Sequence, residues 1–547
     1  MADDEREDAG AAPEDALPAQ EGLDDTREVE SASVAYVPEA PEPAGPPASA
    51  PRRGVGRRVT LVSLRIVRGL VGLAAAAATI AAVGLLPLPT FGIDPLRTLV
   101  EPEPADLQAV CPGALLRLGD DSGGEAGTIF PVGTPALTTA AAPGSVVASG
   151  ISNGDAASSA PAQQPRALAL ASSDDAVLGA AQRQAPDGQG DLSGLAATVC
   201  GEPASSSWIV GGGTTLGRTS ILQLVNPTAV AADVTLELWG EDGQVRAPGR
   251  AGIVVPAGGR VALPLSGFAP DLASPVVHVE ARGGQVVAWL QTSVIRVLDP
   301  GGVDLVAAGE GPAREHVIPA VRIEGGTAVA SSLGIEGYDD LASIIRLGNP
   351  SDEVANVEVS LTPVTGGASP STFEVSLAAG EVTDTHLEAA HELGEEILAD
   401  GSYTVSVRSD VPVVAGVRAS TIVAPTATPD GRLVAGAADL AWFPSAPALR
   451  GEAALAVADA ASPVLVAVAV DGEAHTLVLA PLDGGAEVTV EVPAVGGAAV
   501  ALPPGGVYRI RGGEGVAAAV SFAGAGQLAG YPVVAPRAAD AAIVVRP

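Results

Sequence analysis

Hydrophobic and polar residues alternate along many short segments after residue 205. In residues 234–238, for example, Val234, Leu236 and Leu238 alternate with Thr235 and Glu237. This period of two places the apolar side chains on one face of a strand. Gly and Pro turns separate the segments at spacings typical of β-sandwiches. The pattern therefore predicts a mainly β fold.

Three parts of this pattern recur in the same order, which indicates an internal repeat. The first is a strand, an Asn-Pro turn and a second strand, at residues 221–238 and 344–361, with a weaker copy lacking Asn-Pro at 454–468. The second is a glycine turn entering a strand, at 255–263, 377–382 and 492–502. The third is a predicted hairpin, at 276–288, 403–415 and 508–519.

These recurrences predict three tandem Ig-like β-sandwich domains, at residues 211–315, 316–445 and 446–547. One helix is expected within the second copy, at residues 384–398.

Residues 69–88 form an uncharged run rich in Ala and Leu. At 1.5 Å per residue, a helix of this length crosses a hydrocarbon core of ~30 Å. Arginines at 52–68 precede the run and acidic residues follow it, so the positive-inside rule predicts a cytoplasmic N-terminus. We expect one transmembrane helix within residues 59–93, which makes this a single-pass cell-membrane protein with the bulk of its chain extracellular. A cleaved signal peptide, a lipoprotein anchor at Cys111 and a buried Ala-rich helix are the alternatives.

Composition restricts the chemistry more than the fold. The 547 residues carry a net charge of -35, and all 29 basic residues are arginine. The absence of lysine excludes lysine nucleophiles and a P-loop lysine, and the negative charge disfavours nucleic acid as a partner. Residues 1–58, an acidic tail with a basic flank, contain few large apolar residues and are expected to be disordered. The tail is either a docking segment for a basic cytoplasmic partner or a solvated leader.

Cys111 and Cys200 are the only cysteines, and both follow the predicted membrane helix. An oxidising compartment favours a disulfide between them, which would close a segment spanning residues 94–210. A redox-active thiol pair is the alternative, although the CxxC spacing is missing. Residues 120–195 are rich in Ala, Ser and Gly, so part of this insert is expected to be a mobile loop, with strands at runs such as 167–171.

No catalytic, cofactor-binding or metal site is predicted from residue spacing. The sequence GISNG at 150–154 matches the nucleophile-elbow pattern but lacks its strand and helix. His386 and His391 lie five residues apart, and no HExxH motif is present. Four tryptophans could stack on sugars, but core packing is the favoured interpretation: Trp208, Trp239, Trp289 and Trp442.

Several short motifs together resemble a known family. They are CPG at 111–113, CGEP at 200–203, WIVGGGTTLG at 208–217 and LVNP at 224–227, behind an N-terminal anchor. This combination resembles an uncharacterised family of large secreted or membrane-anchored proteins of high-GC Gram-positive bacteria, a domain of unknown function. The resemblance implies topology and compartment, and it implies no activity.

We therefore expect a non-catalytic, membrane-anchored envelope protein that presents tandem β-sandwiches for binding or structural spacing. Its expected partners are the membrane, through one helix, and an envelope protein or glycan whose identity the sequence does not give. The alternative is an enzyme acting on cell-wall glycan or peptide, which would need paired carboxylates or another catalytic set.

Overall fold

The computed structural model describes residues 98–100, 106–536 and 543–545, together with Val71 and Ala74, which are helical. The segments 120–127, 154–159, 174, 187–190, 366–369, 388–397, 431–432 and 537–542 are not described. The chain divides into two compact units, Met1–Asp94 and Pro95–Pro547. The predicted acidic tail and nearly all of the predicted membrane helix lie outside the described residues. In the described part, no helix has the length and apolar character needed to cross a membrane.

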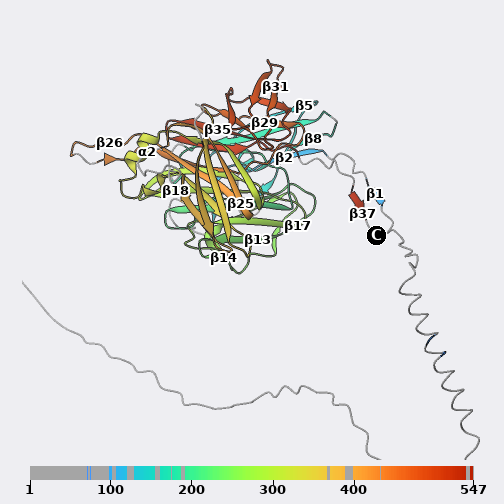
Figure 1. Ribbon diagram of the computed structural model, residues 1–547, viewed down its shortest axis with the longest axis horizontal. Coiled ribbons are helices and arrows are strands. Elements are labelled where there is room, and N and C mark those ends of the chain that lie inside the picture. Colours follow the sequence, from blue (N-terminus) through green and yellow to red (C-terminus); the bar gives the residue numbers. More distant parts are fainter. Residues whose placement is uncertain are drawn as a thin grey trace, which may run out of the picture. The chain divides into compact units, whose positions relative to one another are not determined.

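The unit Pro95–Pro547 is mainly β, which confirms the fold class expected from the alternation (Figure 1). We call residues 206–307 the first copy, 313–444 the second and 453–532 the third. The first copy contains β11 (Ser206–Val210), β12 (Arg218–Asn226), β13 (Ala232–Gly240), β14 (Gly243–Val245), β15 (Ile253–Val255), β16 (Gly259–Pro264), β17 (Val276–Gly283), β18 (Val287–Arg296) and β19 (Asp299–Ala307). The second contains β20 (Ala313–Ile323), β21 (Ile344–Gly348), β22 (Ala355–Pro363), β23 (Ser371–Leu377), β24 (Val382–His386), β25 (Gly401–Ile422) and β28 (Ala438–Pro444). The third contains β29 (Ala453–Ala456), β30 (Val464–Ala469), β31 (His475–Pro481), β32 (Val488–Val492), β33 (Gly497–Ala501), β34 (Val507–Arg511), β35 (Val516–Gly524) and β36 (Gln527–Pro532).

The remaining elements lie before the first copy, in short connections inside the copies, or after the third copy. The segment closed by the disulfide contains β2 (Leu107–Cys111), β3 (Leu115–Leu118), β4 (Ile129–Val132), β5 (Ala136–Ala142), β6 (Val147–Gly150), β7 (Ser152–Asn153), β8 (Arg166–Leu170), β9 (Val177–Gln184) and β10 (Ala196–Val199). Strands β1 (Thr98–Val100) and β37 (Ile543–Val545) pair with each other and lie side by side in Figure 1. Short elements complete the chain: η1 (Pro161–Gln163), η2 (Leu265–Gly267), α2 (Gly326–Ser332), η3 (Asp339–Leu341), β26 (Thr426–Ala427) and β27 (Leu433–Val434).

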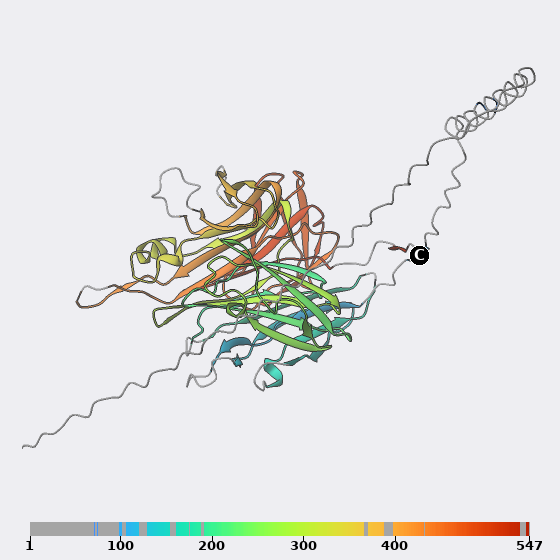
Figure 2. The same cartoon turned by 90° about the horizontal axis from the view of Figure 1, so that it is seen from below.

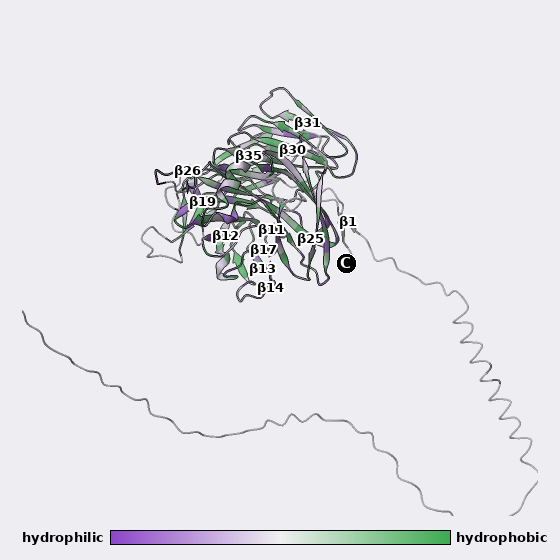
Figure 3. Cartoon of the chain, turned by 60° about the vertical axis from the view of Figure 1, so that its left-hand side comes forward, coloured by the Kyte–Doolittle hydropathy of each residue, from purple (hydrophilic) through white to green (hydrophobic). Residues whose placement is uncertain are grey.

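The three copies share one strand order, which confirms the internal repeat. Each copy has two sheets, and β25 is long enough to serve both sheets of the second copy. The orders are β11-β17-β13-β15 with β16-β12-β18-β19, then β20-β25-β22-β23 with β24-β21-β25-β28, then β29-β34-β31-β32 with β33-β30-β35-β36. Apolar residues from the inner faces of both sheets form one core in each copy. Figure 3 shows hydrophobic residues along the strands of all three copies.

The Asn-Pro turns have the same hydrogen bonds in the first two copies. Asn226 Nδ2 donates to the carbonyls of Val230 (2.8 Å) and Val255 (3.1 Å), and Asn349 Nδ2 donates to those of Glu353 (2.7 Å) and Ala378 (2.9 Å). Both asparagines are buried, so these bonds satisfy amides that would otherwise lose their water. The repeated sequence motif therefore encodes a repeated piece of structure.

Two details of the predicted repeat are wrong. The predicted hairpins are connections between sheets, because β17 and β18 pair with different strands and in different sheets. A Gly283-Gly284 link lets both halves bury apolar residues in the same core. In the third copy, the strand order equates β30 with β12 and β31 with β13, so the weak match at 454–468 is one strand out of register. Ser462-Pro463 precedes β30, whereas Asn226-Pro227 follows β12.

The predicted helix at 384–398 is wrong at its start. Residues 384–386 belong to β24, which pairs with β21 from Ile344 to Gly348. Residues 388–397 lie outside the described part of the chain. Pairing with β21 gives the backbone of residues 382–386 hydrogen-bond partners in the sheet.

The last strands of the three copies, β19, β28 and β36, pack against one another. Figure 2 shows the green strands of the first copy packed beside the yellow and orange strands of the second. The predicted domain limits stay a prediction, although β11 and the start of β20 precede the limits at 211 and 316. Contacts cross the limits at 211, 316 and 446, and Ile344, Leu440 and Trp442 of the second copy belong to the core of the first.

Asp439 on β28 occupies the centre of this junction. Its fully buried carboxylate accepts backbone N–H groups from Leu195 (2.8 Å), Val303 (3.2 Å) and Leu528 (2.9 Å). These donors belong to the disulfide-closed segment, the first copy and the third copy. Burial raises the pKa of Asp439 well above its usual value. One side chain of the second copy therefore binds the other three parts of the unit.

Asp304 makes the stability of the same junction depend on pH. Its buried carboxyl accepts the N–H groups of Trp442 (2.7 Å) and Leu305 (2.8 Å), but desolvation outweighs these bonds and raises its pKa to about 7. Since the pKa is higher in the folded chain than in the unfolded chain, folding binds a proton between about pH 4 and pH 7. This stabilisation is complete at low pH and is lost as the pH rises through 7.

We predict that Asp304→Asn removes this contribution. The free energy of unfolding of the wild type, relative to the variant, should fall by about 2 kcal/mol between pH 5 and pH 8. Urea unfolding at a series of pH values measures the difference. The exposed Asp242→Asn variant is the control and should follow the wild-type profile. Parallel pH profiles for wild type and Asp304→Asn would contradict the prediction.

Candidate functional site

The two cysteines are joined in the structure. Cys111 at the end of β2 and Cys200 after β10 form a disulfide across 89 positions of sequence, with their Cα atoms 4.3 Å apart. Both are buried. Closing a loop of this length stabilises the folded chain by roughly 4 to 5 kcal/mol in the chain-entropy model.

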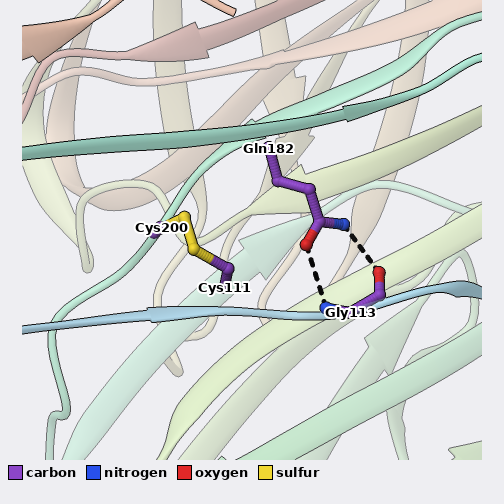
Figure 4. Close-up of a disulfide and its surroundings, with 4 residues drawn as sticks. All are labelled: Cys111, Gly113, Gln182 and Cys200. Carbon is purple, nitrogen blue, oxygen red and sulfur yellow. Dashed lines mark hydrogen bonds between the residues drawn. A yellow bond between two sulfur atoms is a disulfide. The ribbon is translucent and has the colours of Figure 1, made fainter. Parts of the chain in front are cut away.

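Buried glutamine side chains hold the chain that follows Cys111. Gln182 on β9 accepts the N–H of Gly113 (3.0 Å) and donates to its carbonyl (2.6 Å), as Figure 4 shows. Gln291 on β18 pairs with Leu116 in the same two-bond manner, at 2.7 and 2.6 Å. Gln184 accepts the N–H of Leu115 at 3.1 Å. The amide side chains thus supply hydrogen-bond partners to the backbone of residues 113, 115 and 116, although 115 and 116 also pair with β4.

Gly113 allows this close approach. It has a φ of +84°, and a Cβ atom there would lie 2.7 Å from the backbone nitrogen of Pro165. Only glycine adopts that φ freely, and any side chain would displace the main chain of residues 163–165. We call the disulfide, Gly113 and the three glutamines the clamp. Because Gln291 belongs to the first copy, the clamp ties the disulfide-closed segment to it.

The structure describes most of the insert between the cysteines. The described part of residues 120–195 forms strands β4 to β9, including β8 at the run that suggested a strand. Ala180 and Ala181, which are neighbours on β9, are buried in two different cores. The strand expected at 167–171 is confirmed, and the expectation that part of the insert is a mobile loop stays a prediction.

A second group of interacting side chains lies on the outer face of the sheet β11-β17-β13. The imidazole of His278 contacts Ser206 Oγ through Nε2 (3.0 Å) and Glu237 Oε2 through Nδ1 (2.9 Å). His278 lies directly opposite Glu237 on β13, and Ser206 lies one diagonal step away on β11. A nucleophile, a base and an orienting carboxylate have these mutual contacts in serine hydrolases. We call these three residues the Ser-His-Glu set.

Tryptophan packs beside the set. Trp208 stacks on His278 with ring centroids 4.3 Å apart and on Trp239 at 5.2 Å. Trp239 is buried, and the same cluster contains Val382 and Val414 of the second copy. Trp289 and Trp442 are buried as well, so core packing describes three of the four tryptophans, and Trp208 is half-buried.

The other sequence candidates do not come together. Ser152 lies on β7, where its hydroxyl donates to the carbonyl of Gly258, and not at an elbow between strand and helix. His386 is exposed at the end of β24, and His391 lies outside the described residues. In the described part of the chain, no group of three His, Cys, Asp or Glu side chains is placed to hold a metal ion.

Sequence reasoning missed the Ser-His-Glu set and Asp439 for different reasons. Ser206, Glu237 and His278 are separated by 31 and 41 positions, and only the pairing of three strands joins them. Asp439 had a usable signal, since it is the single charge between Ala435 and Pro444. A lone carboxylate in an apolar strand must be buried with donors around it.

The fold and these sites define a mainly β protein built from three copies and closed by one disulfide. The chain belongs to a family of unknown function, DUF5719, whose model matches residues 156–505. This agrees with the resemblance to an uncharacterised family, and it assigns no activity. No curated protein matches the chain. A solved structure, that of Thermotoga maritima protein 1070, is 18% identical and covers 25% of this chain and 95% of its own, with a TM-score of 0.17.

Proposed function

We propose that this protein is a non-catalytic, single-pass protein of the cell envelope whose three copies form one rigid extracellular module. The module binds or spaces other envelope components. The observation that carries the proposal is the junction at Asp439, because a carboxylate bonded to three other segments keeps the surfaces of all copies at fixed relative positions. Surfaces at fixed positions favour binding or spacing over catalysis in an active site that must close around its substrate.

Each copy is proposed to be an Ig-like sandwich. Ig-like sheets pair the second strand with the fifth and the third with the sixth, as β12 pairs with β16 and β13 with β17. The seventh strand differs, since β18 pairs with β12 and not with β17. The proposal therefore covers the central strands and treats the outer ones as a variation.

The proposed location rests on two further observations. A buried disulfide is stable in an oxidising compartment, and Cys111 follows the apolar run 69–88. The net charge of -35 disfavours anionic wall polymers as direct partners, so the proposed partner is an envelope protein or a neutral glycan.

Reporter fusions test this topology. We predict that alkaline phosphatase fused after residue 100 is active, since it folds only outside the cytoplasm, and that the same enzyme fused after residue 40 is inactive. A fluorescent protein that folds only in the cytoplasm should give the opposite pattern. Active alkaline phosphatase at residue 40, or the same phosphatase activity at both fusion points, would refute the proposed location.

The Ser-His-Glu set favours a second candidate function, a serine hydrolase acting on an ester or amide. The contacts of 3.0 and 2.9 Å support it. The position of Ser206 at the start of β11 weighs against it, because Ser206 is followed by a strand and not by the helix whose N-terminus usually stabilises the oxyanion.

A fluorophosphonate probe distinguishes the two candidates. The primary proposal predicts that the full-length chain is not labelled at Ser206 at any pH between 6 and 9. Labelling that Ser206→Ala and His278→Asn abolish, and that the neighbouring Ser207→Ala retains, would replace the primary proposal with the hydrolase. Intact-protein mass spectrometry reads the adduct.

A further inference from the structure

Four arginine side chains converge between the first and second copies. Three of the guanidinium groups pair with two carboxylates. Asp340 contacts Arg218 (2.8 Å) and Arg296 (2.7 Å), and Asp384 contacts Arg346 (2.7 Å). The fourth, Arg418 on β25, donates to the carbonyl oxygens of Asp340 (2.7 Å) and Ala342 (3.2 Å). In these contacts four cations face two anions, a positive surplus inside a strongly acidic protein.

Arg418 is the group that the surrounding residues leave incomplete. It is 8% exposed, and its Nε–H is buried with no hydrogen-bond acceptor. Burial, followed by repulsion from Arg218, lowers the pKa of Arg418 to about 10, which still leaves it charged at neutral pH. A buried cation with an unused donor is costly unless an anion neutralises it.

A cavity of about 100 Å³ adjoins this side chain. It is lined by Arg418 and Arg218, by Thr292 of β18, by Trp442 of β28 and by Asp384. This volume holds several water molecules, and it therefore also accommodates an ion with four oxygen atoms. Two guanidinium groups and one hydroxyl supply donors from separate strands, and Asp384 is already neutralised by Arg346.

We propose that this cavity binds a small inorganic oxyanion, of the size and charge of sulfate or phosphate, between the first and second copies. Several oxygens satisfy donors arriving from different directions, and guanidinium groups bind oxyanions with paired hydrogen bonds. The bound ion balances the surplus positive charge and joins Arg418 of the second copy to Arg218 and Thr292 of the first. The module is therefore more stable where such an anion is present.

Thermal unfolding of the full-length chain tests the site. Phosphate or sulfate at 0.1 to 10 mM, at constant ionic strength set with chloride, should raise the Tm of the wild type by a few degrees. At these concentrations, sulfate does not give the general stabilisation that results from its exclusion from the protein surface. Arg418→Gln and Arg218→Gln should lose the rise. Arg408→Gln, which changes an exposed arginine of the same strand β25, should keep it.

Calorimetric titration of inorganic phosphate into the wild-type chain decides the question if Arg418→Gln does not fold. Saturable binding with one site supports the proposal, and absence of heat at 10 mM overturns it. An equal rise in Tm for all variants overturns it as well, because the effect would then not depend on the cavity. A response to chloride as large as the response to phosphate rejects an oxyanion site in favour of a halide.

Discussion

The carboxylate of Asp439 is the interaction on which the arrangement of the three copies depends. A buried, ionisable group is costly, and its cost is offset only because three backbone N–H groups from three other segments point at it. Gly194 and Gly302 have φ values of +103° and +129°, and a Cβ atom at either would overlap the Asp439 side chain. The surrounding main chain is therefore shaped around this one side chain.

The rest of the junction follows the same principle of polar groups buried with partners. Arg346 pairs with Asp384 and also donates to the carbonyls of Gly212 (2.9 Å) and Pro275 (3.1 Å) in the first copy, while its guanidinium lies over Trp442. The glutamines of the clamp fix the segment before the first copy in the same way. Such directional contacts specify one arrangement of the copies, whereas apolar contact alone would tolerate several.

Three features were predictable from short sequence patterns. The period of two indicated the β fold, the Asn-Pro turn indicated the repeat, and the presence of only two cysteines indicated the disulfide. The connection between β17 and β18 was not predictable, because a Gly-Gly link allows either a hairpin or a change of sheet. Which of the two forms depends on the burial of apolar residues on both inner faces. Strands β5 and β9 were not predicted because Ala-rich strands carry little hydrophobic signal, although Gln182 and Ala181 are fully buried on β9. The Ser-His-Glu set depends on cross-strand register, which no short sequence window contains.

The central claim is that the unit Pro95–Pro547 unfolds as one body because Asp439 joins its parts. The most direct measurement is urea and calorimetric unfolding of the wild type beside Asp439→Ala, with the exposed Asp242→Ala as control. The wild type should show a single transition, and Asp439→Ala should lose at least about 3 kcal/mol, since three buried donors lose their acceptor at about 1 kcal/mol or more each. Three separate wild-type transitions, or a loss for Asp439→Ala within about 0.5 kcal/mol of the control, would contradict the account.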